Sequence, residues 1–357
     1  MSTAAGLRAR LHGRALEASG AAPIDALLRF GIAVTVAMLI FGAIILSEGT
    51  NPLAALRVMW DASVGTDFGR TEVMVKLIPF GLCALAVAIP ARVGLINVGG
   101  EGQFYIGAWA AAGAVLYSGA PGWALIPVGF IAGALGGGAW AGLVAVLRVR
   151  GKVNEAISSL LLNFVAIQFV NYFVYGPWKD PDGPNWPFSP QFSDPAMLPM
   201  LYGDRLSIAI LFVLAGLIAM FLGLRYTRIG YHARVVGGNP VAAQRAGIPV
   251  GRYLLWGLIL GGAIAGVAGM AEVTGIQGRL RPGISGNYGY IGFLAAWLGG
   301  HRPLGILFAC LLFGAISVGG DSLQLALNLP GSTVNILMAL ILFAVLAGRK
   351  NRTEVGA

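Results

Sequence analysis

The chain has 357 residues, of which 57% are hydrophobic and only 11% are charged, and its formal net charge is +9. Soluble globular domains carry about 25% charged residues, so this composition excludes an ordinary soluble protein and predicts a polytopic membrane protein. The basic residues stand at the ends of apolar segments, a distribution typical of membrane orientation rather than of nucleic-acid binding.

Ten apolar segments are long enough, or nearly long enough, to be membrane-spanning helices, which need about 20 residues. In chain order they cover residues 27–46, 77–96, 103–117, 123–147, 156–175, 206–224, 253–273, 288–299, 304–319 and 333–347. The third and eighth are short, and such segments are tolerated at membrane depth where they are tilted, broken or buried in the bundle. We therefore expect an all-α polytopic membrane protein with about ten transmembrane helices in a single membrane domain, residues 27–347.

Lysine and arginine gather in alternate connections between these segments. One set of connections contains, among others, Arg92, Arg302 and the stretch 225–252, which has no Asp or Glu at all. The other set, including the loop 176–205, mixes basic and acidic residues. The positive-inside rule places the first set in the cytoplasm. Both termini then lie inside as basic tails, residues 1–26 and 348–357, which requires an even number of spans.

Few residues indicate chemistry at a metal or a nucleophile. Cys83 and Cys310 lie within apolar segments and are interpreted as small hydrophobic residues. The three histidines are far apart, and none stands in a motif with metal-ligand spacing. We expect no metal site, no cofactor and no enzymatic activity of the chain itself.

Two connections expected outside the membrane have a character of their own. Residues 51–64 are predicted to form a short amphipathic helix, because Asn51 can cap it and Pro52 fits its first turn. Residues 177–199 are rich in Pro and Trp, which excludes a regular helix. An ordered external cap, an interface loop and a plain connector all fit that composition.

Glycines recur at helical spacing in two of the apolar segments. They are Gly129, Gly133, Gly137, Gly138 and Gly142 in one segment, and Gly257, Gly261, Gly262 and Gly266 in the other. Small residues at this spacing let helix backbones approach closely in a membrane. We interpret these glycines as contacts that pack the bundle.

One segment of the chain has an internal echo. GGEGQFYIGAWAA at 99–111 is matched by ISGNYGYIGFLAA at 284–296. In the expected orientation the first copy runs from inside to outside and the second runs the other way, which predicts an inverted repeat. Paired, glycine-interrupted segments of this kind indicate a transport pathway at the repeat interface. Chance similarity between Gly/Ala-rich membrane helices is the alternative.

Polar residues in and near these segments are the candidates for a solute pathway. They are Asn97, Gln103, Tyr105, Asn163, Asn287 and Tyr290. Glu101 is interpreted mainly as a structural residue, with Arg92 or backbone amides as its partners, because charges within a membrane are usually paired. Contact of Glu101 with a solute or an ion is the alternative. Asn154 and Glu155 are interpreted as the start of a helix.

The longest expected cytoplasmic connection contains a short helix. Asn239 is a suitable N-cap, Pro240 fits the first turn and Gly247 can end the helix, so we predict a helix over residues 241–246. Its apolar face is small for insertion into lipid. This favours docking on a partner protein, while a helix lying on anionic lipid is the alternative.

This connection also bears a resemblance to a known family. The segment GGNPVAAQRAGI at 237–248 resembles the coupling-helix motif of bacterial ABC importer permeases, and RVGLINVGGEGQFYIGA at 92–108 is similar to the signature of the branched-chain amino acid, sugar and nucleoside permease group. Three further segments resemble the nucleoside-type permeases that work beside a lipoprotein of the basic membrane protein class. They are KVNEAISSLLLNFVA at 152–166, GPWKDPDG at 176–183 and NYGYIGFLAAWLGGHRPLGI at 287–306.

The resemblance implies a type II importer fold in the bacterial inner membrane, in contact with membrane lipid. The implied partners are cytoplasmic ABC ATPase subunits, a second and related permease chain, and an extracytoplasmic substrate-binding lipoprotein. The implied ATPase-coupling residues are Arg234, Gly237, Gly238, Asn239, Pro240, Ala243, Ala246 and Gly247. The sequence has no GxxxxGK[ST] phosphate loop, so ATP hydrolysis is expected in a separate subunit. Nucleoside import is the expected function; a simple-sugar permease and an ion-coupled secondary transporter are the alternatives.

Overall fold

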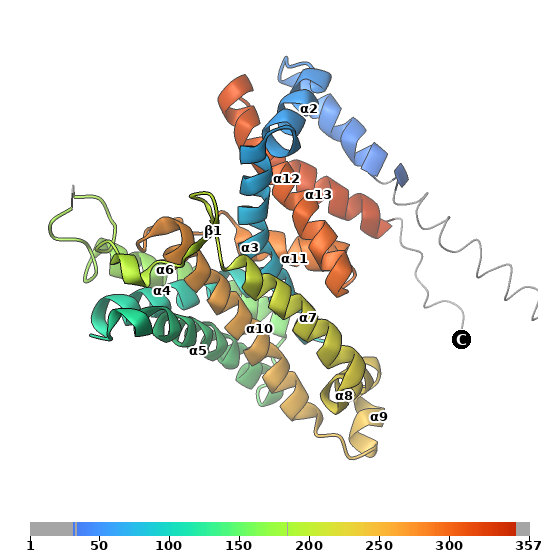
Figure 1. The fold of residues 1–357 in the computed structure, drawn as a ribbon. Coiled ribbons are helices and arrows are strands. Elements are labelled where there is room, and N and C mark those ends of the chain that lie inside the picture. Colours follow the sequence, from blue (N-terminus) through green and yellow to red (C-terminus); the bar gives the residue numbers. More distant parts are fainter. Residues whose placement is uncertain (1–30, 33, 184, 348–357) are drawn as a thin grey trace, which may run out of the picture. The chain divides into compact units, whose positions relative to one another are not determined.

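The computed structural model describes residues 31–32, 34–183 and 185–347, and helices make up most of this part of the chain (Figure 1). The chain divides into two compact units, a larger one formed by Met59–Gly319 and a smaller one formed by Met1–Val58 together with Gly320–Ala357. The basic tails predicted at residues 1–26 and 348–357 lie outside the described residues.

The smaller unit contains a helix over Val34–Ser47, most of α2 (Pro52–Trp60), the end of α12 (Pro303–Leu327) and α13 (Ser332–Ala347). The predicted helix start at Asn51 is confirmed, because the Asn51 side chain accepts a hydrogen bond from the Leu53 amide at 2.9 Å. The predicted helix over residues 51–64 is also confirmed, with its last turn continuing as the π-helical segment η1 (Asp61–Gly65).

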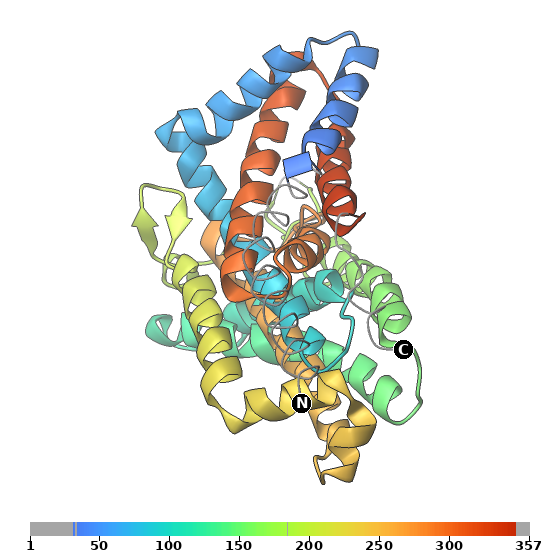
Figure 2. The same ribbon diagram turned by 90° about the vertical axis from the view of Figure 1, so that its right-hand side faces the viewer.

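The larger unit contains the other helices and a small two-stranded sheet. Its elements are α3 (Asp67–Ala91), α4 (Gly100–Tyr117), α5 (Gly122–Val149), α6 (Glu155–Tyr175), the 3₁₀ turn η2 (Asp194–Ala196), β1 (Met200–Tyr202), β2 (Leu206–Ser207), α7 (Ile210–Tyr226), α8 (Arg228–Gly238), α9 (Pro240–Arg245), α10 (Val250–Glu272), the π-helical segment η3 (Val273–Gln277), α11 (Tyr288–Leu298) and the first part of α12. The two strands are antiparallel, with Met200 opposite Ser207. In both ribbon views α8 and α9 form one end of this unit, at the far end of α7 from the strands (Figures 1 and 2).

Most predicted helix boundaries agree with the structure to within a few residues, with three exceptions and one omission. Helix α12 continues to Leu327, beyond the predicted end at residue 319. Helix α3 begins at Asp67, ten residues before the apolar segment, because the Thr66 side chain caps it by accepting from the Gly69 amide at 3.0 Å. Helix α7 begins at Ile210 because residues 206–207 pair as strand β2. Helix α8 was not predicted, and it begins where Thr227 caps the Gly230 amide at 3.1 Å.

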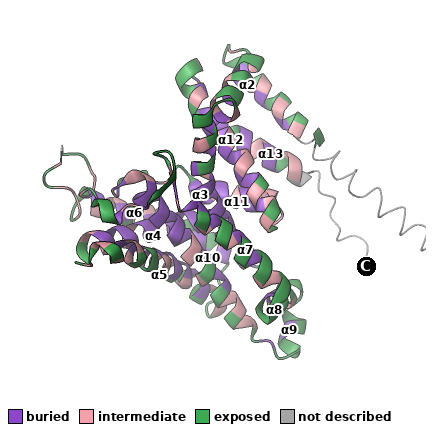
Figure 3. Cartoon of the chain, in the orientation of Figure 1, coloured by how far each residue is buried: buried purple, intermediate pink, exposed green. Residues whose placement is uncertain are grey.

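The described helices are consistent with a polytopic membrane protein. Five of them are long and apolar enough to cross a membrane, and up to seven spans result if each of two bent helix pairs is one span. The ten spans expected from the sequence also include α11, with 11 residues, and α13, with 16 residues. Every residue of α3 from Leu77 to Ala88 is buried, as expected of a helix that is apolar on all sides (Figure 3).

Helices α4, α5 and α10 pack through the glycines that the sequence singled out. A Cβ atom added at Gly137 of α5 would lie 2.7 Å from the Gly266 Cα atom of α10 and would also overlap the Gly262 carbonyl oxygen. Gly107 of α4 meets the backbone of the same Gly266. The predicted role of these residues in close packing is therefore confirmed at this three-helix contact.

The segment rich in Pro and Trp is packed against the helices of the larger unit. The Trp178 ring stacks on Trp109 of α4 with centroids 5.4 Å apart and an interplanar angle of 6°. Further along, the Ser189 amide donates to the Leu280 carbonyl and the Leu280 amide donates to the Ser189 hydroxyl, both at 2.9 Å. These contacts order the segment on the bundle.

Candidate functional site

The two copies of the internal echo meet in the structure, at the first turns of α4 and α11. Glu101 is the second residue of α4 and Gly289 the second residue of α11, and the Glu101 carboxylate accepts a hydrogen bond from the Gly289 amide at 2.7 Å. The Ser285 side chain and the Tyr290 amide lie near the same carboxylate. Glu101 is 2% exposed. The first N–H groups of a helix have no partner within that helix, so Glu101 satisfies donors of the opposite helix.

Gly289 allows the two helix ends to come this close, whereas Gly100 leaves room for an ordinary contact. A Cβ atom at Gly289 would lie 2.5 Å from the Glu101 Cα atom, and one at Gly100 would lie 3.6 Å from the Gly289 Cα atom. Any side chain at Gly289 would therefore separate the two helices and break the Glu101 hydrogen bond. The glycines of the echo serve this contact between backbones.

Three side chains of α6, four residues apart, hold the segment that leads into α4. Glu155 accepts from the Ile96 amide at 3.3 Å, Ser159 from the Val98 amide at 3.2 Å and Asn163 from the Gly102 amide at 2.8 Å. Residues at this spacing share one face of a helix. We call Glu155, Ser159 and Asn163 the α6 ladder.

Asn163 joins this ladder to the second copy of the echo. Its amide nitrogen donates to the Val98 carbonyl at 2.9 Å and to the Tyr290 hydroxyl at 3.2 Å. Asn163 is completely buried. Both the oxygen and the nitrogen of the Asn163 side-chain amide thus form hydrogen bonds within the chain. Of the other predicted pathway residues, Tyr290 is the one that contacts Asn163.

Asn97 and Gln103 form a closed pair of amides beside the same segment. Each side-chain amide donates to the oxygen of the other at 3.0 Å. Asn97 also donates to the Ala86 carbonyl of α3 and accepts from the Gly99 amide, both at 3.1 Å. Both side chains are essentially inaccessible, with exposed fractions of 0% and 1%. The structure places these two residues where they tie the end of α3 to the start of α4.

Three further predicted residues have different surroundings. Tyr105 is buried, with 3% exposed. Tyr290 is half-buried, whereas Asn287 is exposed and precedes α11 in a left-handed conformation with φ of 64°, which asparagine tolerates better than most residues. Tyr290 and Asn287 are therefore the predicted pathway residues that solvent can reach.

The residues predicted as structural are also engaged. The Asn154 side chain accepts from the Ala156 and Ile157 amides at 2.9 and 3.3 Å, which confirms it as the N-cap of α6. Glu155 additionally pairs with Arg148 at 3.1 Å. The Arg92 side chain donates to the His301 carbonyl. For Glu101 the sequence predicted either Arg92 or backbone amides as partners, and the structure shows a backbone amide, that of Gly289.

Sequence reasoning overlooked Ser159 and Ser285. A signal for Ser159 was present, because Glu155, Ser159 and Asn163 repeat at intervals of four in a mainly apolar helix. Ser285 offered no such signal, since it lies in a loop and contacts Glu101 only through the tertiary fold. Glu272, a second buried carboxyl group, is 2% exposed and accepts from the Gln277 side-chain amide at 2.8 Å.

The predicted helix of the 225–252 connection is present as α9, and the structure shows how it is mounted. The Asn239 side chain caps it by accepting from the Ala242 amide at 3.0 Å, and Gly247 ends it with a φ of 78°. Ala243 is fully buried in a cluster of apolar residues from the end of α3 and from α5, α8 and α10, among them Val93, Val144, Val236 and Leu258.

The opposite face of α9 is open. Val241, Ala242, Gln244 and Arg245 are exposed, and so are Gly237 and Gly238 before the helix and Ala246 after it. Ala243, which the sequence grouped with the coupling residues, therefore seats the helix on the protein instead of facing outward. The short helix presents a small, basic surface on a firm apolar base.

Comparison with known proteins assigns this arrangement to a family. Residues 69–346 match the family described as branched-chain amino acid transport system / permease component. The chain is 35% identical to a glucose ABC transporter permease protein of Haloferax volcanii over 93% of this chain and 91% of that one. It is 26% identical to a guanosine ABC transporter permease protein of Bacillus subtilis, over 91% and 94% of the two chains, and 26% identical to a nucleoside ABC transporter permease protein of Lactococcus lactis, over 88% and 89%. The chain belongs to this family of ABC transporter permease subunits.

Proposed function

We propose that the chain is the permease subunit of an ATP-driven importer for a small polar solute, and that this solute is a nucleoside. The family match over residues 69–346 is the observation that supports a permease. Relatives named for guanosine and for nucleosides support the solute class. The alternative is a simple sugar, favoured by the 35% identity to the glucose permease. An ion-coupled secondary transporter has no such support.

The proposed route passes the contact between α4 and α11, with these two segments acting as an inverted repeat. The meeting of two helix N-termini around Glu101 supports this location, because discontinuous helices with ends at mid-membrane form solute sites in many transporters. Asn287, which is exposed, and Tyr290, which is half-buried, are the accessible polar candidates. Three buried amides, those of Asn97, Gln103 and Asn163, would hold the start of α4 in place through hydrogen bonds within the chain.

The proposed docking site for the ATPase subunits is α9 with the glycines that flank it. Its exposed face and its apolar seat support this role, since a short helix that transmits motion must be anchored to the spans. Arg234 lies on α8 directly before it, and its side chain bonds the Leu224 carbonyl at the end of α7. Movement of α9 would then be passed to α7 and α10.

The proposed assembly lies in the bacterial inner membrane and contains a second, related permease and an extracytoplasmic binding lipoprotein. Two different guanosine permease proteins of Bacillus subtilis match this chain, and so do two glucose permease proteins of Haloferax volcanii, one of them putative. Pairs of distinct chains with one named solute support a heteromeric permease pair.

Uptake measurements test the function. In a strain lacking this chain, import of radiolabelled guanosine or uridine should fall to background and return when the chain is restored, while import of labelled glucose should not change. Loss of glucose uptake alone would replace the nucleoside with a sugar. ATP-independent uptake by the purified chain in liposomes would contradict an ABC permease.

A further inference from the structure

A cavity of about 630 Å³ lies in the larger unit beside the bend between α7 and α8. The end of α3, the end of α7, the start of α8 and the start of α10 line it, and its walls are mainly apolar, including Met220, Leu224, Trp256 and Leu260. Trp256 and Leu260 are 57% and 51% exposed, so the cavity opens toward the surroundings of the helices. We call it the α7–α8 groove. Its volume is in the range of sites for small molecules, about 300–1,000 Å³.

The polar contribution to this groove is cationic. Arg92 and Arg252 both line it. The Nε atom of Arg92 is buried and has no hydrogen-bond partner, although the other end of the guanidinium bonds the His301 carbonyl. Among the residues that the structure describes, no carboxylate pairs with Arg92, Arg234 or Arg252. Burial, together with the nearby Arg302 and Arg234, lowers the pKa of Arg92. The groove therefore offers positive charge that no carboxylate of the described residues compensates.

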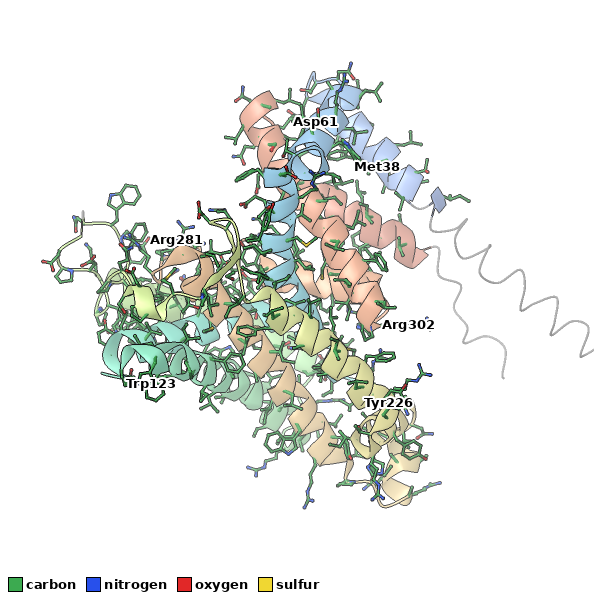
Figure 4. All side chains as sticks on the ribbon, in the orientation of Figure 1. Met38, Asp61, Trp123, Tyr226, Arg281 and Arg302 are labelled. Atoms are coloured by element: carbon green, nitrogen blue, oxygen red, sulfur yellow. The ribbon has the colours of Figure 1, made fainter. Side chains whose placement is uncertain are left out.

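The groove lies where lipid headgroups would be. Helix α3 ends at Ala91 and α10 begins at Val250, so the arginines stand at helix ends while Trp256 and Leu260 stand one to two turns inside α10. Helix α7 ends at Tyr226, labelled in Figure 4, and is bent by 79° against α8. By the positive-inside rule this end faces the cytoplasm. The groove thus has arginines at its edge and apolar walls deeper inside. This arrangement matches a ligand with a charged end and an apolar end.

We propose that the α7–α8 groove binds one anionic phospholipid of the cytoplasmic leaflet, with its phosphate at Arg92 and Arg252 and an acyl chain along Trp256 and Leu260. Arginine is suited to phosphate because its planar guanidinium donates two parallel hydrogen bonds. Basic pockets between membrane helices on the cytoplasmic side recognise anionic headgroups in this way.

The two terminal segments outside the described residues are unsuitable occupants of the α7–α8 groove because of their charge. Residues 1–30 contain four arginines against Glu17 and Asp25, and residues 348–357 contain Arg349, Lys350 and Arg352 against Glu354. Both segments are positive, as is the groove. The lipid assignment rests on the orientation of the proposed permease but not on its solute, so the uptake assay and the lipid assay fail independently.

Quenching of Trp256 by brominated lipid tests the proposal. The full-length chain is placed in nanodiscs of phosphatidylcholine that contain increasing fractions of phosphatidylglycerol brominated on its acyl chains, or of equally brominated phosphatidylcholine. The Trp256 signal is the difference between the wild-type chain and Trp256→Phe. We expect phosphatidylglycerol to quench this signal at a several-fold lower mole fraction than phosphatidylcholine. Equal quenching by the two lipids would overturn the proposal.

The Arg252→Gln variant tests the headgroup contact. Arg252 is exposed and its side chain forms no hydrogen bond or ion pair with the described residues, so its replacement should not affect folding. We expect the half-quenching fraction of phosphatidylglycerol to rise about fivefold, the effect of roughly one arginine near an anionic surface. Arg150→Gln, an equal charge change at an exposed arginine outside the groove, should leave it unchanged.

Two outcomes would overturn the lipid assignment. The first is an Arg252→Gln variant that matches wild type. The second is displacement of brominated phosphatidylglycerol by inorganic phosphate at millimolar concentration, which would show a site for free phosphate. As an independent measurement, native mass spectrometry should show one retained phosphatidylglycerol fewer on Arg252→Gln than on wild type or Arg150→Gln.

Discussion

The carboxylate of Glu101 accepts a hydrogen bond from the amide of Gly289, with 2.7 Å between Oε2 and N, although 188 positions separate the two residues. Each residue lies in the first turn of a helix. The first N–H groups of a helix have no partner within that helix and give its N-terminus partial positive charge, so two N-termini in contact need an acceptor oxygen between them. Glu101 supplies that acceptor, which explains a carboxyl group with 2% exposure inside an apolar bundle.

Replacing Glu101 tests this explanation. Glu101→Ala leaves the Gly289 amide buried without an acceptor, which costs about 1–3 kcal/mol, so the midpoint of thermal inactivation of the purified chain should fall clearly. Glu101→Gln keeps one acceptor oxygen and should lose much less. If the alanine and glutamine variants inactivated at the same temperature as wild type, Glu101 would have no role at the contact between α4 and α11.

Asn163 offers a second test, on the α6 ladder. Asn163→Ala removes the acceptor for the Gly102 amide and the donor to Tyr290, so we expect a destabilisation of about 1–3 kcal/mol. Gln168→Ala alters an exposed amide on the same helix and should change the stability by less than about 0.5 kcal/mol. Thermal inactivation of both variants measures the difference. A stable Asn163→Ala chain with impaired uptake would instead assign Asn163 to the solute pathway.

The contact between α5 and α10 predicts opposite outcomes for two glycines of one helix. Gly137→Ala would place a methyl group 2.7 Å from the Gly266 Cα atom, so the helices must separate and the yield of folded protein in the membrane should fall severalfold. At Gly142 the nearest atom to an added Cβ is Ile259 Cγ1 at 3.8 Å, an ordinary contact. Gly142→Ala should therefore be folded like wild type. Detergent extraction followed by size-exclusion chromatography checks both; normal behaviour of Gly137→Ala would show that the packing adapts.

Helix α9 predicts a separation between docking and folding. Arg245→Glu reverses a charge on the exposed face, and co-purification of the ATPase subunits should fall about tenfold or more, equivalent to at least 1.4 kcal/mol, with unchanged thermal inactivation of the isolated chain. Ala243→Leu overfills the buried seat and should lower the inactivation temperature.

A matched control separates docking from net charge. Arg150→Glu makes the same charge change at an exposed arginine in the turn after α5, outside α9 itself, and should retain the ATPase subunits. Retention of the subunits by Arg245→Glu as well would remove this face of α9 from the interface.

Much of the helical architecture was predictable because its causes are local. Asn154 and Asn239 cap helices through residues two or three positions away, and both caps could be recognised from the sequence. The start of α3 was missed because the polar residues after Asp67 hide a helix that extends beyond its apolar segment. Residues 206–207 were assigned to a helix because two residues are too few for the period of a strand to appear.

The contact between the two echo segments was predictable, but the side-chain contacts around it were not. Residues 99–111 and 284–296 were expected to belong together, and Glu101 and Gly289 touch. The expected pathway amides Asn97 and Gln103 instead bond each other. A pattern of amides cannot distinguish a polar path from a closed pair, because both need the same residues.

By itself, the sequence determined that the chain is a helical membrane protein and where most of its helices lie, since hydropathy and caps depend on neighbours within a few positions. Only the tertiary structure decided that Glu101 serves Gly289, that the α6 ladder holds the start of α4 and that Ala243 seats α9. Those contacts join residues far apart in the chain. They depend on how closely glycine residues let the helix backbones approach each other. No local sequence pattern specifies that distance.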